Sequence, residues 1–277
     1  MESKELSVVI VTFKSESKIF DCLNSIPNFI QVKIVENSNN KSFKENIEKK
    51  YTNVECILVG ENKGYAVANN IGLKKVKTKY ALILNPDTIL NKDVINNFFI
   101  TAKKLKEFWL IGSANDQVNN IYSRDNHVLE VDNLKGHAIF FNIEKFENNF
   151  FDENYFLYFE EIDLCKKVKK NNGKIFLDKN IIIKHLGASS VENVNELELE
   201  KNRNWHWMWS SFYFHKKYKG FAIALLIIFP KFITSFFKII FYFIILNKKK
   251  RDIYFCRFSG ILNSILGKKS WYRPSLD

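Results

Sequence analysis

Two hydrophobic patterns alternate along the first 190 residues of the chain. Short apolar runs rich in β-branched residues occur at Leu6–Phe13, Val32–Glu36, Val54–Val59 and Tyr80–Leu84. Each predicts a strand, and the continuous run Leu6–Phe13 is typical of strands that are buried on both faces of a parallel sheet. The segments Glu16–Ile26 and Ala66–Lys74 have helical spacing instead. This alternation predicts an α/β fold with right-handed crossovers between its strands.

The pattern continues with shorter elements as far as residue 190. Residues 115–132 are polar and poorly periodic, which favours a loop or a small hairpin. Ala138–Phe141 predicts a strand and Glu161–Lys170 a helix, and two further strands are expected at Ile175–Leu177 and Ile181–Ile183. Ligands of such sheets bind beyond the carboxyl ends of the strands, so the residues that follow each strand are where chemistry is expected.

The remaining residues have a different pattern. An aromatic stretch at Arg203–Tyr218 precedes an almost wholly apolar segment, Phe221–Leu246, which contains Pro230, Lys231 and Lys238. As a helix this segment would be about 39 Å long at about 1.5 Å per residue, enough to cross a bilayer. However, each lysine at the centre of a spanning helix costs about 2.5–3.5 kcal/mol. We therefore expect two helices, broken at Pro230, that lie in the membrane interface; a buried hairpin is the alternative.

Charge separates the same two regions. The chain has 277 residues and a net charge of +12, and its hydrophobic content of 46%, with only ten Gly and four Pro, excludes a disordered chain. Residues 201–277 contain fifteen basic residues and two acidic ones, a net charge of +13, whereas residues 1–200 carry −1. This division argues against a nucleic-acid binder and favours an anionic membrane surface as partner.

Cysteine usage and the N-terminus indicate the compartment. The four cysteines are scattered and form no C-x-x-C pair, which argues against a disulfide scaffold or a zinc site and fits a reducing cytosol. No apolar stretch precedes Leu6, so we expect no cleavable signal peptide.

Polar motifs follow several of the predicted strands. Glu36 ends the second strand, and Asn85-Pro86-Asp87 follows the fourth. Small residues and asparagines alternate through Asn62–Gly72, where a helix start could lie close to a phosphate group. Three acids, Glu160, Glu161 and Asp163, open a later helix. Clustered, partly buried carboxylates raise one another's pKa, which suits a general base, although the same acids could simply stabilise a helix N-terminus.

In this order the motifs SVVIVTF, VENS, NKGYAVANNIG, NPDT, FDE with FEEIDL, and KHLG resemble the inverting family-2 glycosyltransferases of the GT-A fold. The rhamnosyltransferase-like branch of bacterial polysaccharide biosynthesis is the most similar. The resemblance covers most of residues 6–190. It implies a GT-A domain over residues 1–200, a mixed sheet flanked by helices, followed by a basic, aromatic-rich helical membrane-associated region over residues 201–277.

The resemblance also implies roles for individual residues. Donor-binding residues would be Thr12, Glu36, Asn62, Gly64, Asn70, Asn85, Asp87 and Gly136. Asp87 and His185 would hold Mg²⁺ or Mn²⁺. Glu161 aligns with the family's catalytic base, where Asp is usual, and Asp163 and Glu160 stay open as alternatives. His137, beside Gly136, would contact the donor sugar or the acceptor.

The implied activity is metal-dependent, inverting transfer of one hexosyl or deoxyhexosyl group. The donor would be a UDP- or dTDP-linked sugar, and the acceptor a saccharide, expected to be polyprenyl-linked, at the cytoplasmic face of the bacterial inner membrane. Processive enzymes of this superfamily carry Q-x-x-R-W, which the sequence around Arg203 lacks. The alternative function is a non-catalytic or nucleotidyltransferase-like protein that binds nucleotide sugars at the membrane.

Overall fold

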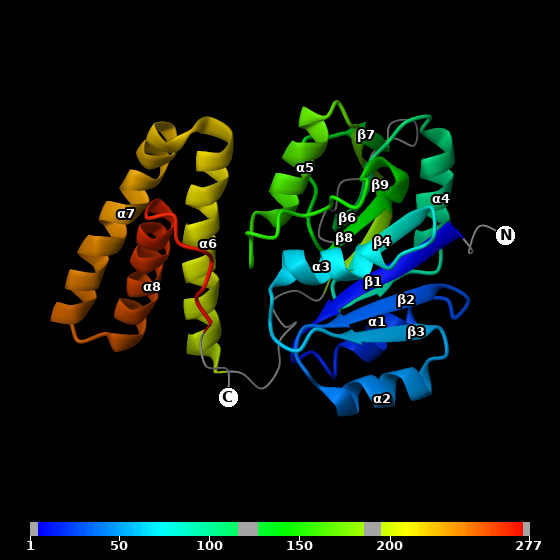
Figure 1. Ribbon diagram of the computed structural model, residues 1–277, viewed down its shortest axis with the longest axis horizontal. Helices are drawn as coiled ribbons and strands as arrows, with labels where there is room; N and C mark the ends of the chain where they lie inside the picture. Colours follow the sequence, from blue (N-terminus) through cyan, green and yellow to red (C-terminus); the bar gives the residue numbers. More distant parts are fainter. Residues whose placement is uncertain (1–4, 116–126, 186–194, 274–277) are drawn as a thin grey trace. The chain divides into compact units, whose positions relative to one another are not determined.

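The computed structural model describes residues 5–115, 127–185 and 195–273. The chain forms two compact units (Figure 1). The first unit comprises residues 1–151 and 161–192, and the second comprises residues 152–160 and 193–277. The chain therefore leaves the first unit after Phe151 and re-enters it at Glu161.

The first unit is built on a mixed sheet, which has nine strands within the described residues. The strand order is β3-β2-β1-β4-β8-β6-β9-β5, with β7 paired to β9. Neighbours from β3 to β4 are parallel, and β8 is antiparallel to β4. The strands are β1 Leu6–Thr12, β2 Gln31–Glu36, β3 Val54–Leu58, β4 Tyr80–Leu84, β5 Thr88–Leu90, β6 Leu110–Asn115, β7 Val128–Glu130, β8 Ala138–Asn142 and β9 Ile175–His185.

Helices pack on this sheet and complete a buried apolar core. They are α1 Ile19–Asn24, α2 Lys41–Lys50, α3 Tyr65–Lys74, α4 Val94–Lys104, the short 3₁₀ helix η2 Ile143–Lys145, and α5 Glu160–Lys170. Helix α3 lies so close to β1 that a Cβ atom at Gly72 would be 2.4 Å from Val9 Cγ1. A glycine is therefore needed there. The expected mixed α/β fold is confirmed.

The end of the first unit differs from the sequence prediction. The two strands expected at Ile175–Leu177 and Ile181–Ile183 are one strand, β9, whose register with β6 shifts between Ser113 and Ala114. The polar residue in its middle, Asp178, is buried and accepts hydrogen bonds from Thr101 and from the Asn180 backbone, and it pairs with His127. Of the loop or hairpin expected at residues 115–132, positions 116–126 lie outside the described residues, and β7 forms near its end.

Three helices dominate the second unit: α6 Glu196–Lys219, α7 Phe221–Ile244 and α8 Lys248–Ile265, and each packs on the other two (Figure 1). A Cβ atom at Gly260 of α8 would lie 2.4 Å from the Trp205 carbonyl oxygen of α6, so these two helices are in backbone contact. The expected break at Pro230 is wrong, because α7 runs through it. The domain boundary expected after residue 200 falls inside α6 and stays a prediction.

Helix α7 has few buried side chains, namely Ala224, Ile228 and Ser235. Its large apolar residues point outward and are exposed, among them Leu226, Phe229, Phe236, Phe237, Ile240, Phe241, Phe243 and Ile244. The alternative of a buried hairpin is therefore wrong. Within the described residues, α7 is the one helix whose length and composition would allow it to cross a membrane.

All four cysteines, Cys22, Cys56, Cys165 and Cys256, lie in the described part of the chain as buried free thiols. Burial raises the pKa of Cys22, Cys56 and Cys165 to about 12.

Candidate active site

The carboxyl ends of β1 and β2 bring Thr12 and Glu36 together. The Thr12 hydroxyl donates to Oε2 of Glu36 over 2.5 Å, and the Ser38 hydroxyl donates to Oε1 over 2.5 Å. Burial raises the pKa of Glu36, and the two hydroxyl donors partly offset this effect. Each carboxylate oxygen can accept a second hydrogen bond, so Glu36 keeps capacity for a donor group such as the N–H of a nucleotide base.

Asn37 ties the next loop to the end of β2. Its Nδ2 donates to Asn62 Oδ1 at 3.0 Å and to the Gly64 carbonyl at 3.2 Å, and its Oδ1 accepts from the Lys63 backbone N–H at 3.0 Å. Asn62 Oδ1 also accepts from the Gly64 N–H. Gly64 caps α3 with φ of +88°, a conformation that favours glycine. The loop before α3 is therefore held beside β2 in a fixed form.

Asp87 and His185 meet where the start of β5 pairs with the end of β9. Antiparallel pairing of β5 with β9 places Thr88 opposite His185, and His185 Nε2 lies 3.2 Å from Asp87 Oδ1. The Asp87 side chain is fully buried, whereas His185 is 24% exposed. His137 stacks on the His185 ring with centroids 5.1 Å apart. The two residues expected to hold a cation are thus adjacent, and one of them faces solvent in part.

A run of contacts leads from this pair to Glu161. Asn85 Nδ2 lies 3.5 Å from His185 Nε2. The Tyr65 hydroxyl is 3.3 Å from Asn85 Oδ1 and donates to the Gly136 carbonyl over 2.8 Å. A Cβ atom at Gly136 would lie 3.6 Å from Glu161 Cβ and 3.9 Å from its carboxyl carbon. These contacts link the expected metal pair to Gly136, which lies beside Glu161.

Tyr65 is the member of this run to which the sequence prediction gave no role. Its position at the first residue of α3 is set by the Gly64 cap. The only signal in the sequence was an aromatic residue inside the small-residue motif Asn62–Gly72.

The three acids at the start of α5 differ in burial. Asp163 is fully buried at 0% exposure and Glu160 is buried at 6%, whereas Glu161 is half-buried. Burial raises the pKa of Glu161, partly offset by backbone N–H groups of the helix start. Glu161 is thus partly reachable from solvent and has a raised pKa, two properties that suit a general base.

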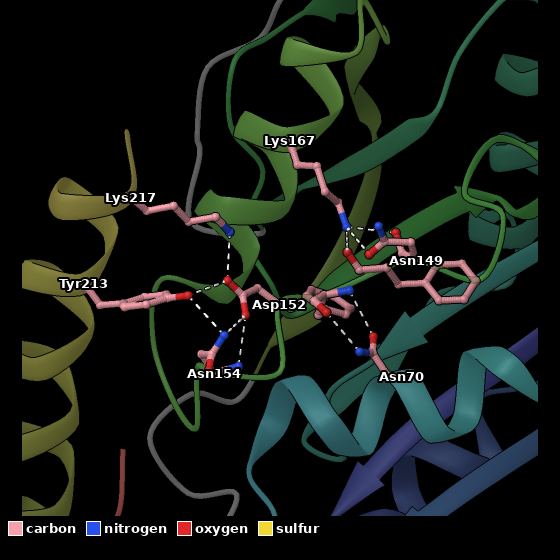
Figure 2. Close-up of polar contacts among 9 residues, drawn as sticks. Asn70, Asn149, Asp152, Asn154, Lys167, Tyr213 and Lys217 are labelled. Carbon is pink, nitrogen blue, oxygen red and sulfur yellow. Dashed lines mark hydrogen bonds and ion pairs between the residues drawn. The ribbon is translucent and has the colours of Figure 1, made fainter. Parts of the chain in front are cut away.

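The side chain of Asn70 makes hydrogen bonds to the backbone of Phe151. Its Nδ2 donates to the Phe151 carbonyl and its Oδ1 accepts from the Phe151 N–H, each over 2.9 Å (Figure 2). This pairing fixes the chain just before it leaves the first unit. A donor-binding role for Asn70 stays a prediction, as do those of the other donor-binding residues.

The donor set fits a divalent cation bound with a diphosphate. Among the described residues no group of three or more His, Cys, Asp or Glu could hold a metal ion. Asp87 and His185 would supply one oxygen and one nitrogen ligand, and hard cations commonly take their remaining ligands from substrate phosphates and water.

Comparison with known proteins agrees with this geometry. Residues 7–164 match the sequence profile of the family described as "Glycosyl transferase family 2". The chain belongs to this family. Membership favours glycosyl transfer over the alternative of a nucleotidyltransferase-like or non-catalytic protein.

Individual relatives are distant. The low-salt glycan biosynthesis hexosyltransferase Agl10 of Haloferax volcanii is 23% identical over 194 residues, which cover 61% of this chain and 62% of Agl10. The chain thus spans about three fifths of that relative's length. Among solved structures, S. aureus TarS 1–349 with UDP-GlcNAc has a TM-score of 0.54 at 14% identity, covering 97% of this chain and 93% of TarS 1–349. The mannosyltransferase PcManGT of Pyrobaculum calidifontis, in complex with GDP-Man and Mn²⁺, has a TM-score of 0.59 at 11% identity, covering 96% and 88%. These likenesses show the GT-A fold.

Proposed function

We propose that this glycosyltransferase moves one sugar from a nucleotide-diphosphate donor to a saccharide acceptor with inversion at the anomeric carbon. The run of contacts from the Asp87–His185 pair through Tyr65 and Gly136 to Glu161 carries the proposal. It supports the action of a cation-binding pair and a carboxylate of raised pKa on one donor sugar, as single-displacement glycosyl transfer requires.

In the proposed reaction Glu161 takes the proton of the acceptor hydroxyl. The acceptor oxygen then bonds to the anomeric carbon from one side while the bond to the donor phosphate breaks on the other, and the nucleoside diphosphate leaves with the electron pair. Because Glu161 must be ionised, kcat should fall as the pH falls through its raised pKa.

The residues Asp87 and His185 would hold Mg²⁺ or Mn²⁺ against the donor diphosphate. Such a cation supplies charge stabilisation to the departing phosphate oxygens. Glu36, with Thr12 and Ser38 behind it, would accept the base N–H, and the loop fixed by Asn37 would border the nucleotide. Support for nucleotide-sugar chemistry comes from TarS, solved with UDP-GlcNAc, and from PcManGT, solved with GDP-Man and Mn²⁺.

The acceptor is proposed to be a polyprenyl-linked saccharide at the cytoplasmic membrane face, in surface polysaccharide synthesis. The exposed apolar face of α7 and the basic cluster Lys248–Arg251 support membrane binding, with α7 lying in the interface rather than spanning it. Agl10, a hexosyltransferase of glycan biosynthesis, supports the role in glycan assembly.

The test is donor turnover by the full chain with a panel of UDP-, dTDP- and GDP-sugars, with Mn²⁺, with Mg²⁺ and after chelation. Asp87→Asn should lower turnover about 100- to 1000-fold, because it weakens the charge that holds the cation. It should also remove the extra thermal stabilisation that Mn²⁺ adds to the nucleotide-bound protein.

Asp93→Asn is the matched control, since Asp93 is exposed and its side chain makes no capping hydrogen bond to α4. It should leave turnover and the Mn²⁺ effect unchanged. An Asp87→Asn protein with full turnover and a normal Mn²⁺ response would refute the metal site, and a Glu161→Gln protein with full kcat would refute the base.

A further inference from the structure

Lys238 is a charged residue on the apolar helix α7, between Phe237 and Phe241, which are 62% and 54% exposed. Its ammonium group reaches helix α8, which packs beside α7 (Figure 1), and donates to the Tyr254 hydroxyl oxygen over 2.8 Å. Within the described residues this hydroxyl has no other hydrogen-bond partner. Because its oxygen already accepts from Lys238, its own hydrogen still needs an acceptor.

Arg257 of α8 brings a second positive charge to the Tyr254 ring. Its Cζ lies 5.5 Å from the centroid of this ring, and Lys238 Nζ lies 4.7 Å from the same centroid. Arg257 Nη1 donates to Asn204 Oδ1 of α6 over 3.1 Å, but Nε is buried and has no hydrogen-bond partner in the described part of the chain. Burial also lowers the pKa of Arg257, as expected for a cation without a counter-ion.

The charges around Tyr254 are therefore unbalanced. Among the residues that the structure describes, no carboxylate forms an ion pair with Lys238 or Arg257. Asp252, the single acid in the sequence of α8, is paired with Arg251 at 2.9 Å. The hydrogen bond to Tyr254 raises the pKa of Lys238, and the positive charge of Arg257 opposes this rise, so the two cations repel each other. An anion bound near both would remove this repulsion.

We infer that Lys238, Tyr254 and Arg257 form a binding site for the phosphate group of an anionic phospholipid. The inference deepens the proposed membrane binding of α7 and rests on it. Phosphate oxygens accept charge-assisted hydrogen bonds from ammonium and guanidinium groups, and the phenol O–H supplies a further donor. Phe237 and Phe255, the exposed rings next to Lys238 and Tyr254 in the chain, would contact the acyl chains of the same lipid.

This site differs from the basic residues Lys248, Lys249 and Lys250 at the start of α8. Those three lysines are exposed, and they would attract any anionic surface through long-range charge. Lys238 is only partly exposed, and it shares a hydrogen-bonded partner with a second cation. A phosphate bound there would also offset the cost of a lysine on an apolar helix, because it holds the ammonium group at the depth of the headgroups.

The test is flotation of the full chain with vesicles of phosphatidylcholine, with and without phosphatidylglycerol. Lys238→Gln should weaken binding to the anionic vesicles about 10- to 100-fold, because it removes a charge-assisted hydrogen bond as well as a charge. Binding to vesicles of phosphatidylcholine alone should stay within about two-fold of wild type, since the apolar face of α7 is unchanged. Equal circular dichroism spectra establish that the variants are folded.

Lys231→Gln is the matched control. Lys231 lies on the same helix seven positions earlier, it is exposed, and its side chain makes no hydrogen bond or ion pair with any described residue. The change in net charge is the same, so this variant should lose about five-fold at most, the effect of one surface charge. Tyr254→Phe removes a hydroxyl without changing the charge and should weaken binding to the anionic vesicles about 2- to 10-fold.

Three results would overturn the inference. Equal losses in Lys238→Gln and Lys231→Gln, or unchanged binding in Tyr254→Phe, would mean that charge alone attracts the membrane. Release of the wild type from anionic vesicles by inorganic phosphate, at an ionic strength matched with sodium chloride, would mean that the ligand is a soluble phosphate. If the wild type floats with neither kind of vesicle, the proposed membrane binding itself fails, which distinguishes the two failures.

Discussion

Phenylalanine side chains are buried in the core of the first unit but largely exposed on helix α7 of the second. In the first unit the rings of Phe98 and Phe140 stack 5.0 Å apart and are wholly buried. In the second, Phe237 and Phe243 of α7 are 62% and 63% exposed. The first unit buries most of its apolar residues in its own core, whereas the second leaves many of them exposed on α7. Hydrophobic content alone would not have separated the buried residues from the exposed ones.

The largest expected effect is on the free energy of unfolding, when a buried and an exposed phenylalanine are each replaced by alanine. Phe140→Ala should lower the free energy of unfolding by about 3–5 kcal/mol, because it leaves a cavity among rings packed on β8. Phe237→Ala should change it by less than about 0.5 kcal/mol. Equilibrium urea unfolding followed by circular dichroism measures both. Comparable losses in the two variants would mean that α7 is packed against protein after all.

Membrane binding gives the next largest effect. Phe237→Ser should weaken binding to vesicles containing anionic phospholipid about 10- to 100-fold, since burial of a phenylalanine contributes about 1.5–3 kcal/mol. Flotation of the full chain with such vesicles measures it.

Phe29→Ser supplies the control for that experiment. Phe29 belongs to the first unit and is also 62% exposed, so residue type and exposure are matched. Its substitution should leave flotation unchanged. If both variants bind vesicles as wild type does, the exposed face of α7 is not a membrane surface.

The smallest effect concerns how stability depends on pH through Asp152, whose carboxylate accepts hydrogen bonds from Tyr213 and Lys217 of α6. A carboxyl with a lowered folded pKa contributes stability above its unfolded pKa of about 3.9 and loses it as the pH falls through the folded value. Asp152→Asn should therefore cost about 1.5 kcal/mol at pH 7, with the difference from wild type shrinking below about pH 4. Urea unfolding at both pH values measures it. Asp132→Asn, at a side chain 88% exposed, should show almost no difference at either pH, and a pH-independent loss in Asp152→Asn would argue against an ionic anchor.

Much of the first unit could be predicted from the sequence. The apolar runs located β1 to β4 almost to the residue. β1 and β4 are buried along nearly their whole length and contain no charged residue, whereas Lys33 and Glu55 interrupt β2 and β3 at one inner position each. The resemblance of NPDT and KHLG to the family's motifs selected Asp87 and His185, and the two side chains lie 3.2 Å apart. The roles of these residues in binding and catalysis stay predictions.

The sequence pattern did not predict those features that depend on contacts between residues far apart in the chain. The sequence predicts two strands, Ile175–Leu177 and Ile181–Ile183, yet Thr101 and His127, far away in the chain, pair with the intervening Asp178 inside one strand. Pro230 suggested a break between two helices, but a proline removes only one backbone donor, and α7 continues through it. The contacts of α6 with residues 152–160 leave no periodic pattern in the sequence, because they join aromatic rings about 50 positions apart in the chain.

The four buried thiols have a practical consequence. Thiolates are the reactive form, and a pKa near 12 leaves almost none of Cys22, Cys56 or Cys165 ionised at neutral pH. The wild-type chain should therefore resist maleimide reagents while folded. A single cysteine engineered on an exposed position would then accept a fluorophore or spin label selectively, without first replacing the native ones.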